Sequence, residues 1–296
     1  TSVVSFAAEC GEDFASFPVV SVGCTIGSYE YDTLACLKKR TLHLDNGATY
    51  DTTYECLKGA DPGTTTTLVG KVKNGENELS YTYDALGNIE TISENGVLKC
   101  KYYYDELNQL TREDNVWENQ TVCYTYDVGG NITKRKEYDY TTEATPPAAK
   151  LNKQYSYGYE NSKWKDQMTR YGSEDITYDN MGNPLTYRAM TMTWEKGREL
   201  KKVVYYKTTA TYTYGSDGIR TSKTVDGVTT LYYLNGDKII GLKKGDELSH
   251  FIYDQNDRLV SIQVDGRGYY YLYNAQNDII GLIDSSGNQV VSYRYS

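Results

Sequence analysis

The sequence has very few of the residues on which enzyme active sites depend. Only two of its 296 residues are histidine, His43 and His250, one in each half of the chain. Serine and cysteine nucleophiles need a nearby base, most often histidine, and no Gly-x-Ser-x-Gly segment is present. Both histidines lie in short stretches in which apolar and polar residues alternate, as they do in a strand, so each is expected to lie on one face of a sheet. The sequence therefore predicts that the chain is not an enzyme.

Motifs for metals, cofactors and phosphate are also missing. The six cysteines lie at positions 10, 24, 36, 56, 100 and 123, and no two form a Cys-x-x-Cys pair. This spacing fits neither a zinc site nor a redox motif, so we interpret the cysteines as free thiols in apolar slots of strands. The glycines follow hairpin spacing rather than Gly-x-Gly-x-x-Gly, and no calcium-binding loop is spelled out. We predict no cofactor and no metal.

Basic charge and long apolar runs are scarce as well. The net charge is −9, which argues against nucleic acid or an anionic membrane as a partner. No apolar run approaches the roughly 20 residues that span a bilayer, so membrane insertion is not expected. The chain starts at Thr1 without an initiator methionine or signal peptide and stops abruptly at Ser296. We interpret it as a piece of a longer protein.

What the sequence does contain is tyrosine: 32 residues, against four phenylalanines and three tryptophans. Many tyrosines occur in one phrase, Tyr-x-Tyr-Asp, and the second tyrosines Tyr83, Tyr104 and Tyr126 are 21 and 22 residues apart. Self-similarity at a period near 20 residues indicates stacked units rather than one domain with a private core. Copies of the phrase, some degenerate, start at Tyr29, Tyr81, Tyr102, Tyr124, Ile176, Phe251, Tyr271 and Tyr293.

Each unit reads as two short strands joined by two kinds of turn. The third residue after the Asp-type position needs a left-handed backbone, and glycine, asparagine or aspartate fills it. These residues are Gly87, Asn108, Gly130, Gly182, Gly218, Asp257 and Asn277; Ala35 is the exception in the first copy. The opposite turn is expected to be a type I′ hairpin, marked by Asn46-Gly47, Asn74-Gly75, Asn95-Gly96, Asp226-Gly227, Asp265-Gly266 and Ser286-Gly287. Alternating turns predict a continuous antiparallel meander and an all-β fold.

Irregular spacing shows where the pattern is interrupted. The interval from Tyr126 to Tyr157 is too long, and the excess near residues 141–150 has the composition of a loop. After Tyr178 the spacing becomes regular if Trp194 replaces a tyrosine. A single curved sheet has no deep core, so we expect stacked tyrosine rings to hold the units together while their hydroxyls stay in water.

Two alternatives remain open from the residues alone. The many carboxylates would allow a paired-acid glycosidase, although an Asp at every turn is better explained by capping backbone N–H groups. Trp117, Trp164 and Trp194 would suit a sugar-stacking platform, or they cover the sheet and seal its loops.

The repeated Tyr-x-Tyr-Asp-x-x-Gly-Asn phrases resemble the YD-repeat family, also called RHS repeats, of bacterial secreted toxins, wall-associated proteins and teneurins. The resemblance covers residues 29–295, and residues 14–23 more weakly. It implies a single-layer β-sheet that spirals around a hollow. In the toxin branch a core segment plugs this shell and a C-terminal effector follows; neither lies in this chain. The family's self-cleaving aspartates belong to the absent segment, so no catalytic residue is carried over.

The resemblance leads to definite expectations. Residues 1–28 would be degenerate first repeats and residues 29–296 tandem repeats that end before the core segment and effector. The function would be a non-catalytic wall that encloses its own C-terminal effector, in a secreted or cell-surface protein of a bacterium. The alternative is an adhesion module that binds a glycan or a cell-surface protein. The expected structural repeat residues are Tyr81, Tyr83, Asp84, Gly87, Asn88, Tyr104, Asp105, Tyr126, Asp127, Gly130, Asn131, Tyr178, Asp179, Gly182, Tyr214, Tyr253, Asp254 and Tyr273.

Overall fold

The protein is all-β, as the alternating turns predict. The computed structural model describes residues 2–3, 26–33, 36–61 and 64–295. The weakly matching residues 14–23 and Cys10 and Cys24 lie outside this part. Within it, the one helical piece is a three-residue 3-10 turn, η2 (Ala148–Lys150).

The strands form two sheets in which every strand pairs with its neighbour in the sequence. The first sheet holds fourteen strands: β1 (Ser2–Val3), β2 (Gly27–Tyr31), β3 (Leu37–His43), β4 (Thr49–Lys58), β5 (Thr65–Asn74), β6 (Asn77–Tyr83), β7 (Ile89–Glu94), β8 (Val97–Tyr104), β9 (Leu110–Asn115), β10 (Gln120–Tyr126), β11 (Ile132–Asp139), β12 (Leu151–Gly158), β13 (Arg170–Tyr171) and β14 (Glu174–Asp175). The second holds twelve: β15 (Thr186–Tyr187), β16 (Met190–Glu195), β17 (Glu199–Tyr205), β18 (Thr208–Tyr214), β19 (Arg220–Val225), β20 (Val228–Asn235), β21 (Lys238–Lys244), β22 (Glu247–Tyr253), β23 (Leu259–Val264), β24 (Arg267–Tyr273), β25 (Ile279–Ile283) and β26 (Gln289–Ser292). All pairings are antiparallel, which makes one long meander.

A β-bulge recurs at the same place in most units. Between β6 and β7, Thr82 pairs with Thr91 but Tyr83 pairs with Ile89, so one extra residue lies on the returning strand. The same shift precedes Tyr31, Tyr104, Tyr126, Trp194, Tyr214, Tyr253 and Tyr273. Because a bulge bends its strand and increases the local twist, these recurring bulges curve the sheet steadily. The sequence pattern did not indicate this bulge.

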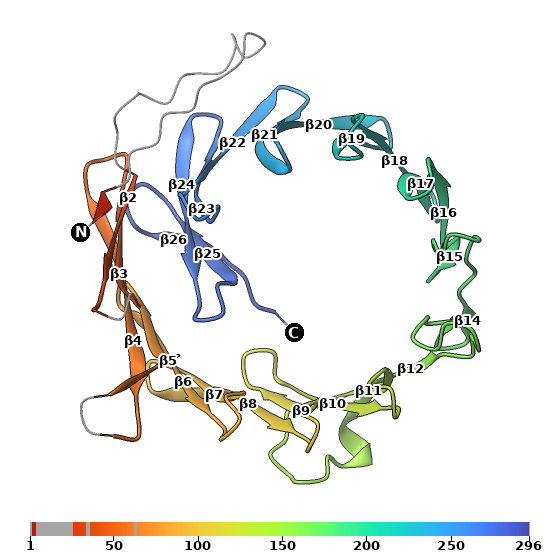
Figure 1. Ribbon diagram of the computed structural model, residues 1–296, viewed down its shortest axis with the longest axis horizontal. Helices are drawn as coiled ribbons and strands as arrows, with labels where there is room; N and C mark the ends of the chain where they lie inside the picture. The colour runs from red at the N-terminus through yellow and green to blue at the C-terminus, as the bar shows by residue number, and fades with distance from the viewer. Residues whose placement is uncertain (1, 4–25, 34–35, 62–63, 296) are drawn as a thin grey trace.

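The curved meander closes into a ring around a central space (Figure 1). Strands β23–β26, drawn in blue, lie inside the first strands of the chain rather than continuing beside them. The C-terminal end therefore lies within the ring, while β1 lies on its outer side. The chain makes one turn of a spiral whose last strands overlap its first.

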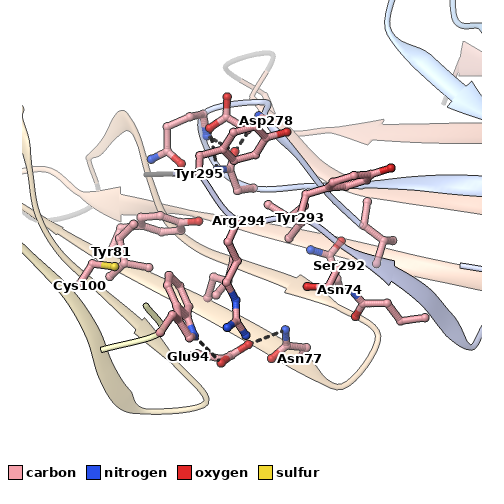
Figure 2. Close-up of a pocket in the computed structure, with 18 of the residues that line it drawn as sticks. Asn74, Asn77, Tyr81, Glu94, Cys100, Asp278, Ser292, Tyr293, Arg294 and Tyr295 are labelled. Atoms are coloured by element: carbon pink, nitrogen blue, oxygen red, sulfur yellow. Dashed lines mark hydrogen bonds between the residues drawn. The ribbon is translucent and has the colours of Figure 1, made fainter. Parts of the chain in front are cut away.

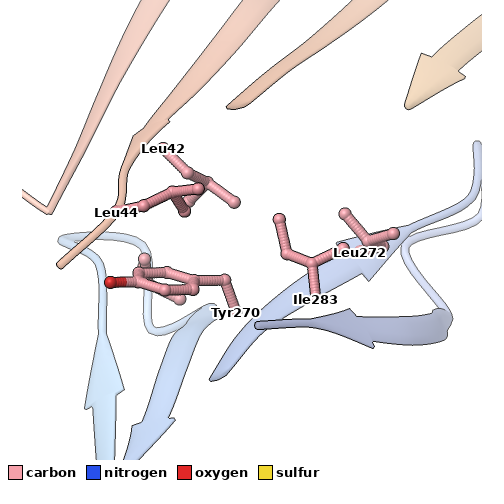
Figure 3. Packing of buried hydrophobic residues seen from close by; sticks show 6 residues of the cluster. Leu42, Leu44, Tyr270, Leu272 and Ile283 are labelled. Carbon is pink, nitrogen blue, oxygen red and sulfur yellow. The ribbon is translucent and has the colours of Figure 1, made fainter. Parts of the chain in front are cut away.

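A buried core forms where the two ends overlap. Leu42 and Leu44, at the end of β3, pack against Tyr270 and Leu272 of β24 and Ile283 of β25 (Figure 3). Leu42 and Ile283 are completely buried. The expectation that this sheet has no deep core is therefore wrong at the overlap, because two layers of sheet face each other there. Each buried large apolar side chain contributes about 1.5–3 kcal/mol of transfer free energy.

The tyrosines of the repeat face the interior of the ring. The loop of residues 140–147 lies on the outer side in Figure 1, and Arg112 of β9 donates to the carbonyl oxygens of Thr141, Glu143 and Ala144 in it. Strand neighbours alternate faces, so Arg112 and Glu113 point in opposite directions. Glu113 pairs with Tyr102, which lines a cavity beside the inner strand β26. The sheet face that lines the lumen is thus the tyrosine face.

Candidate functional site: the inner face of the ring

The Asp-type turn is built by one carboxylate. Asp84 Oδ1 accepts the backbone N–H groups of Leu86 (2.8 Å) and Asn88 (2.9 Å), and its Oδ2 accepts the Asn88 side-chain amide (2.9 Å). These bonds hold the pKa of Asp84 below its usual value, the Asn88 side chain being the largest cause. Gly87 has φ +87°, a left-handed backbone that a residue with Cβ adopts at a cost. The same two backbone bonds recur at Asp105, Asp127, Asp179, Asp254, Asn274 and Asp284.

The second turn class does not have the members that the sequence indicated. Asn74 pairs with Asn77, so the turn there is Gly75-Glu76, whereas Arg188-Ala189 has positive φ at both residues. Asn95-Gly96, Asp226-Gly227 and Asp265-Gly266 have positive φ at both residues, as a type I′ turn requires. Asn46-Gly47 and Ser286-Gly287 were assigned to this class wrongly. Gly287 N–H donates to the Asp284 carbonyl and Asp284 N–H to the Asn288 carbonyl, which is the Asp-type pattern, and residues 44–48 repeat it. The dipeptide alone does not separate the classes, because both need a left-handed residue.

In most units one hydrogen bond links the unit to the one before it. The hydroxyl of Tyr104 donates to the carbonyl oxygen of Ile89 (3.0 Å), and that of Tyr126 to Leu110 (2.7 Å). We call this bond the unit link. Further unit links start from Tyr83, Tyr159, Tyr178, Tyr214, Tyr253, Tyr273 and Tyr295. The expectation that these hydroxyls stay in water is wrong, since each reaches a backbone carbonyl. Phenylalanine would lack this donor, so the link accounts for the preference for tyrosine.

The unit link also corrects and extends the repeat assignment. Trp194 Nε1–H donates to the Pro184 carbonyl (2.7 Å), five residues after Asp179, as Ile89 is five after Asp84. Trp194 therefore takes the place of a tyrosine, as the spacing indicated. In the interrupted unit it is Tyr159, not Tyr157, that makes the link, to the Ile132 carbonyl (3.1 Å).

Direct ring contacts gather where the two sheets meet. Tyr171 of β13 contacts Tyr155 and Tyr157 of β12, and also Tyr187 of β15, at centroid distances of 5.5–5.8 Å. The Arg188 guanidinium lies 4.7 Å from the Tyr171 centroid. No strand pairing joins β14 to β15 in the described chain, so this aromatic group bridges the break. Such contacts contribute about 0.5–1.5 kcal/mol each beyond their buried area.

The unit link gives a direct prediction. Tyr126→Phe keeps the ring but leaves the Leu110 carbonyl without its donor, so the free energy of unfolding should fall by about 0.5–1.5 kcal/mol. The measurement is denaturant unfolding followed by circular dichroism. Tyr206→Phe is the matched control, because Tyr206 is 76% exposed, and its unfolding should not change. Equal stability of the two variants would show that the link contributes nothing.

Polar contacts join the first and last strands across the overlap; we call them the seam. The Tyr29 hydroxyl donates to Asp254 Oδ2 (2.8 Å), and the Tyr270 hydroxyl donates to Asp45 Oδ1 (2.8 Å). The Asn74 amide donates to the Tyr273 carbonyl (3.1 Å). Tyr29 and Asp254 are both buried, and burial raises the pKa of Tyr29 well above its usual value. The hydroxyl therefore stays protonated and donates to the carboxylate.

Two guanidinium groups lie inside the seam. Arg40 is 1% exposed and donates through Nη2 to the Tyr271 carbonyl, and burial lowers its pKa. The Arg40 and Arg258 guanidinium carbons lie 5.4 and 3.7 Å from the centroid of the Tyr273 ring. Asp254 is the buried carboxylate of this group. Because buried charge is costly to leave without a partner, removing the Asp254 carboxylate should weaken the seam.

A cavity of about 910 Å³ lies between the inner face of β6–β9 and the last strands. Tyr81, Cys100 and Tyr102 line its wall side, and residues 290–295 line the other. Figure 2 shows Arg294 reaching into it from the C-terminal end. The Arg294 guanidinium lies 5.4 Å from the Trp117 ring, whose Nε1–H donates to Glu94 (3.0 Å). Burial raises the pKa of Tyr81 to about 12, so its phenol stays protonated at neutral pH, beside the Glu94 carboxylate that also lines the cavity.

The two histidines lie apart from the inner cavity. His43 is in β3 and His250 in β22, and neither lines the cavity; burial lowers the pKa of His250. Across the described ranges no three histidine, cysteine or acidic residues are placed to hold a metal ion. No helix in the same residues is long and apolar enough to cross a membrane. Cys36, Cys56, Cys100 and Cys123 are free thiols.

The three tryptophans occupy separate places. Trp117 lines the inner cavity and Trp194 makes a unit link. Trp164 packs on the backbone of Gly182, where an added Cβ would lie 2.9 Å from its ring. They do not form a common sugar-stacking platform.

Comparison with known proteins gives relatives of one kind. No protein-family model matches the chain. The tRNA3(Ser)-specific nuclease WapA of Bacillus spizizenii is 35% identical over 200 residues, which cover 65% of this chain and 8% of that protein. The tRNA nuclease WapA of Bacillus subtilis strain 168 is 36% identical over 200 residues, which again cover 65% of this chain and 8% of that protein. The chain thus spans about a twelfth of the length of these relatives.

Solved structures share the fold. The crystal structure of TcdB2-TccC3-Cdc42 superposes with a TM-score of 0.60 at 16% identity, covering 91% of this chain and 17% of that one. The crystal structure of TcdB2-TccC3 gives a TM-score of 0.57 with the same coverage. The WapA relatives and the shared fold thus confirm the resemblance to YD-repeat shell proteins that the Tyr-x-Tyr-Asp repeats indicated.

Proposed function

We propose that this chain is a non-catalytic wall segment of a secreted bacterial toxin, and that it encloses a polypeptide carried by the same protein. The observation that carries the proposal is the position of the last strands. Residues 289–295 lie inside the ring and rest on its inner face (Figures 1 and 2). A polypeptide continuing from Tyr295 would therefore start in the lumen, surrounded by sheet.

The inner face suits an enclosed polypeptide. The hydroxyls of its repeat tyrosines donate to backbone carbonyls in the unit links. These hydroxyls are therefore not available to an enclosed polypeptide, which would meet the aromatic rings instead. The sheet is hydrogen-bonded from strand to strand, which leaves little backbone for a protease to bind. The relatives are named as nucleases, and the chain matches only 8% of their length, which fits a wall segment that is separate from the active part.

The wall role also accounts for the carboxylates. Each repeat Asp is used by its own turn, so the acids are spread around the ring rather than paired in one place. We propose the same structural role for the other expected repeat residues. A glycosidase would need two carboxylates facing each other across a substrate.

Limited proteolysis of the full-length parent protein tests the proposal. The polypeptide after residue 296 should be cut much more slowly in the intact protein than when it is expressed alone. A variant that opens the seam, Asp254→Ala, should restore fast cutting, whereas Asp84→Ala, which alters an equivalent turn away from the seam, should not. Equal cutting of the intact protein and the isolated polypeptide would rule out enclosure.

A further inference from the structure

Two of the free cysteines lie close together beside the β3–β4 pair: Cys36 directly precedes β3, and Cys56 is in β4. In the β3–β4 pair, Lys39 is opposite Thr53, Arg40 opposite Thr52 and Thr41 opposite Asp51. The pairing ends at Lys39 and Thr53, and Cys36 and Cys56 each lie three residues beyond these positions, where an unbroken register would bring them opposite each other. The position of Cys36 is fixed locally, because its N–H donates to Asp32 Oδ1 (2.9 Å) and its carbonyl accepts the Asp32 N–H (2.9 Å).

The two thiols touch. The Cys36 and Cys56 side chains are hydrogen-bonded to each other, and both residues are half-buried. Directly opposed residues of antiparallel strands have Cα atoms about 4.5–5.5 Å apart, depending on the kind of pair. A disulfide requires about 4.4–6.8 Å between Cα atoms, so the backbone needs no large movement to accept the bond.

We propose that Cys36 and Cys56 form a disulfide bond that fastens β3 to β4. Formation requires a disulfide oxidant such as oxidised glutathione. The Cys36 thiolate attacks one glutathione sulfur and releases glutathione thiolate; the Cys56 thiolate then attacks Cys36 Sγ and releases the second. The two protein thiols lose two electrons and two protons, which are recovered as two molecules of reduced glutathione.

The other described cysteines are poorly placed for this reaction. Cys100 is 1% exposed, and burial raises its pKa to about 12, so its thiolate is scarce. Burial also raises the pKa of Cys123. Burial and the neighbouring Cys36 thiol raise the pKa of Cys56 as well, so oxidation should become faster as the pH rises.

The bond would strengthen the overlap of the ring. Strand β3 carries Arg40 and Leu42 and is followed by Leu44, and all three residues contact the last strands. A disulfide between β3 and β4 restricts the unfolded chain and prevents β3 from separating alone. Oxidation would therefore hold the closed ring together more firmly, in the compartment where a secreted protein works.

The test compares the protein after incubation with oxidised and with reduced glutathione. Alkylation and peptide mapping should show a Cys36–Cys56 linked peptide only after oxidation, with two hydrogen atoms lost and neither thiol alkylated. The denaturation midpoint should rise on oxidation and return with reduced glutathione. Cys36→Ser should abolish the rise, and the matched control Cys123→Ser should keep it.

Two results would overturn the proposal. One is that Cys36 and Cys56 are both still alkylated after oxidation. The other is that the linked peptides join either of them to Cys10 or Cys24 instead. Both results come from peptide mapping of the unmutated protein, so neither depends on how well a variant folds.

Discussion

Replacing Asp254 with alanine is expected to lower the free energy of unfolding by about 3–5 kcal/mol, the usual result of removing one partner from a buried charged group. The carboxylate is 4% exposed. It accepts the Tyr29 hydroxyl across the seam and the N–H groups of Asn256 and Arg258 within its own turn. The variant leaves the buried Tyr29 hydroxyl without its acceptor and removes a negative charge from a site near the Arg40 and Arg258 guanidinium groups, all three of which act on Tyr29.

The repeat supplies an internal control for this experiment. Asp84 makes the same two backbone bonds but lies in a turn away from the seam. Asp84→Ala should therefore lose only the turn contribution, about 0.5–1.5 kcal/mol for each hydrogen bond after water replaces the carboxylate. Urea unfolding of both variants gives the difference that belongs to the seam. If Asp254→Ala is no less stable than Asp84→Ala, the seam network does not stabilise the ring.

The second large effect is expected from Leu42→Ala. Leu42 is completely buried between the first and last strands (Figure 3), so the truncation removes apolar contacts and leaves a cavity. The free energy of unfolding should fall by about 2–5 kcal/mol. The last strands should also separate from β3 more readily, which hydrogen exchange in β24 and β25 would detect as faster exchange.

Leu86→Ala is the control for Leu42→Ala. Leu86 is 70% exposed at the tip of a turn, and its truncation should change the free energy of unfolding by less than about 0.5 kcal/mol. If Leu42→Ala is as stable as Leu86→Ala, the two ends of the ring are in contact without stabilising each other.

The repeat could be read from the sequence because it is local. An Asp followed by a left-handed residue three positions later dictates its own turn, and the bonds of Asp84 and Asp127 stay within four residues. The substitution of Trp194 for a tyrosine was also visible in the spacing, since the unit link needs one aromatic donor per unit. The exchange of Tyr157 for Tyr159 was not visible, because the loop of residues 140–147 hides the register.

The regular features of the inner face followed from periodicity, but their chemistry did not. The phrase Tyr-x-Tyr-Asp indicates that Tyr102 and Tyr104 share a face, yet only the structure shows Tyr104 donating to the Ile89 carbonyl. The bulge before each second tyrosine escapes sequence reasoning as well, since an extra residue in one strand looks like an ordinary strand position.

By itself the sequence determined the unit: two strands, two turns, one aromatic donor and one capping carboxylate, all set by contacts within one unit or between consecutive units. Only the tertiary structure decided how the units close. The curvature of the ring depends on the bend that each bulge adds, and these small bends accumulate over many units. The accumulated curvature brings Arg40 against Tyr271 and Leu42 against Ile283. These residues are far apart in the chain, and no local pattern specifies that they meet.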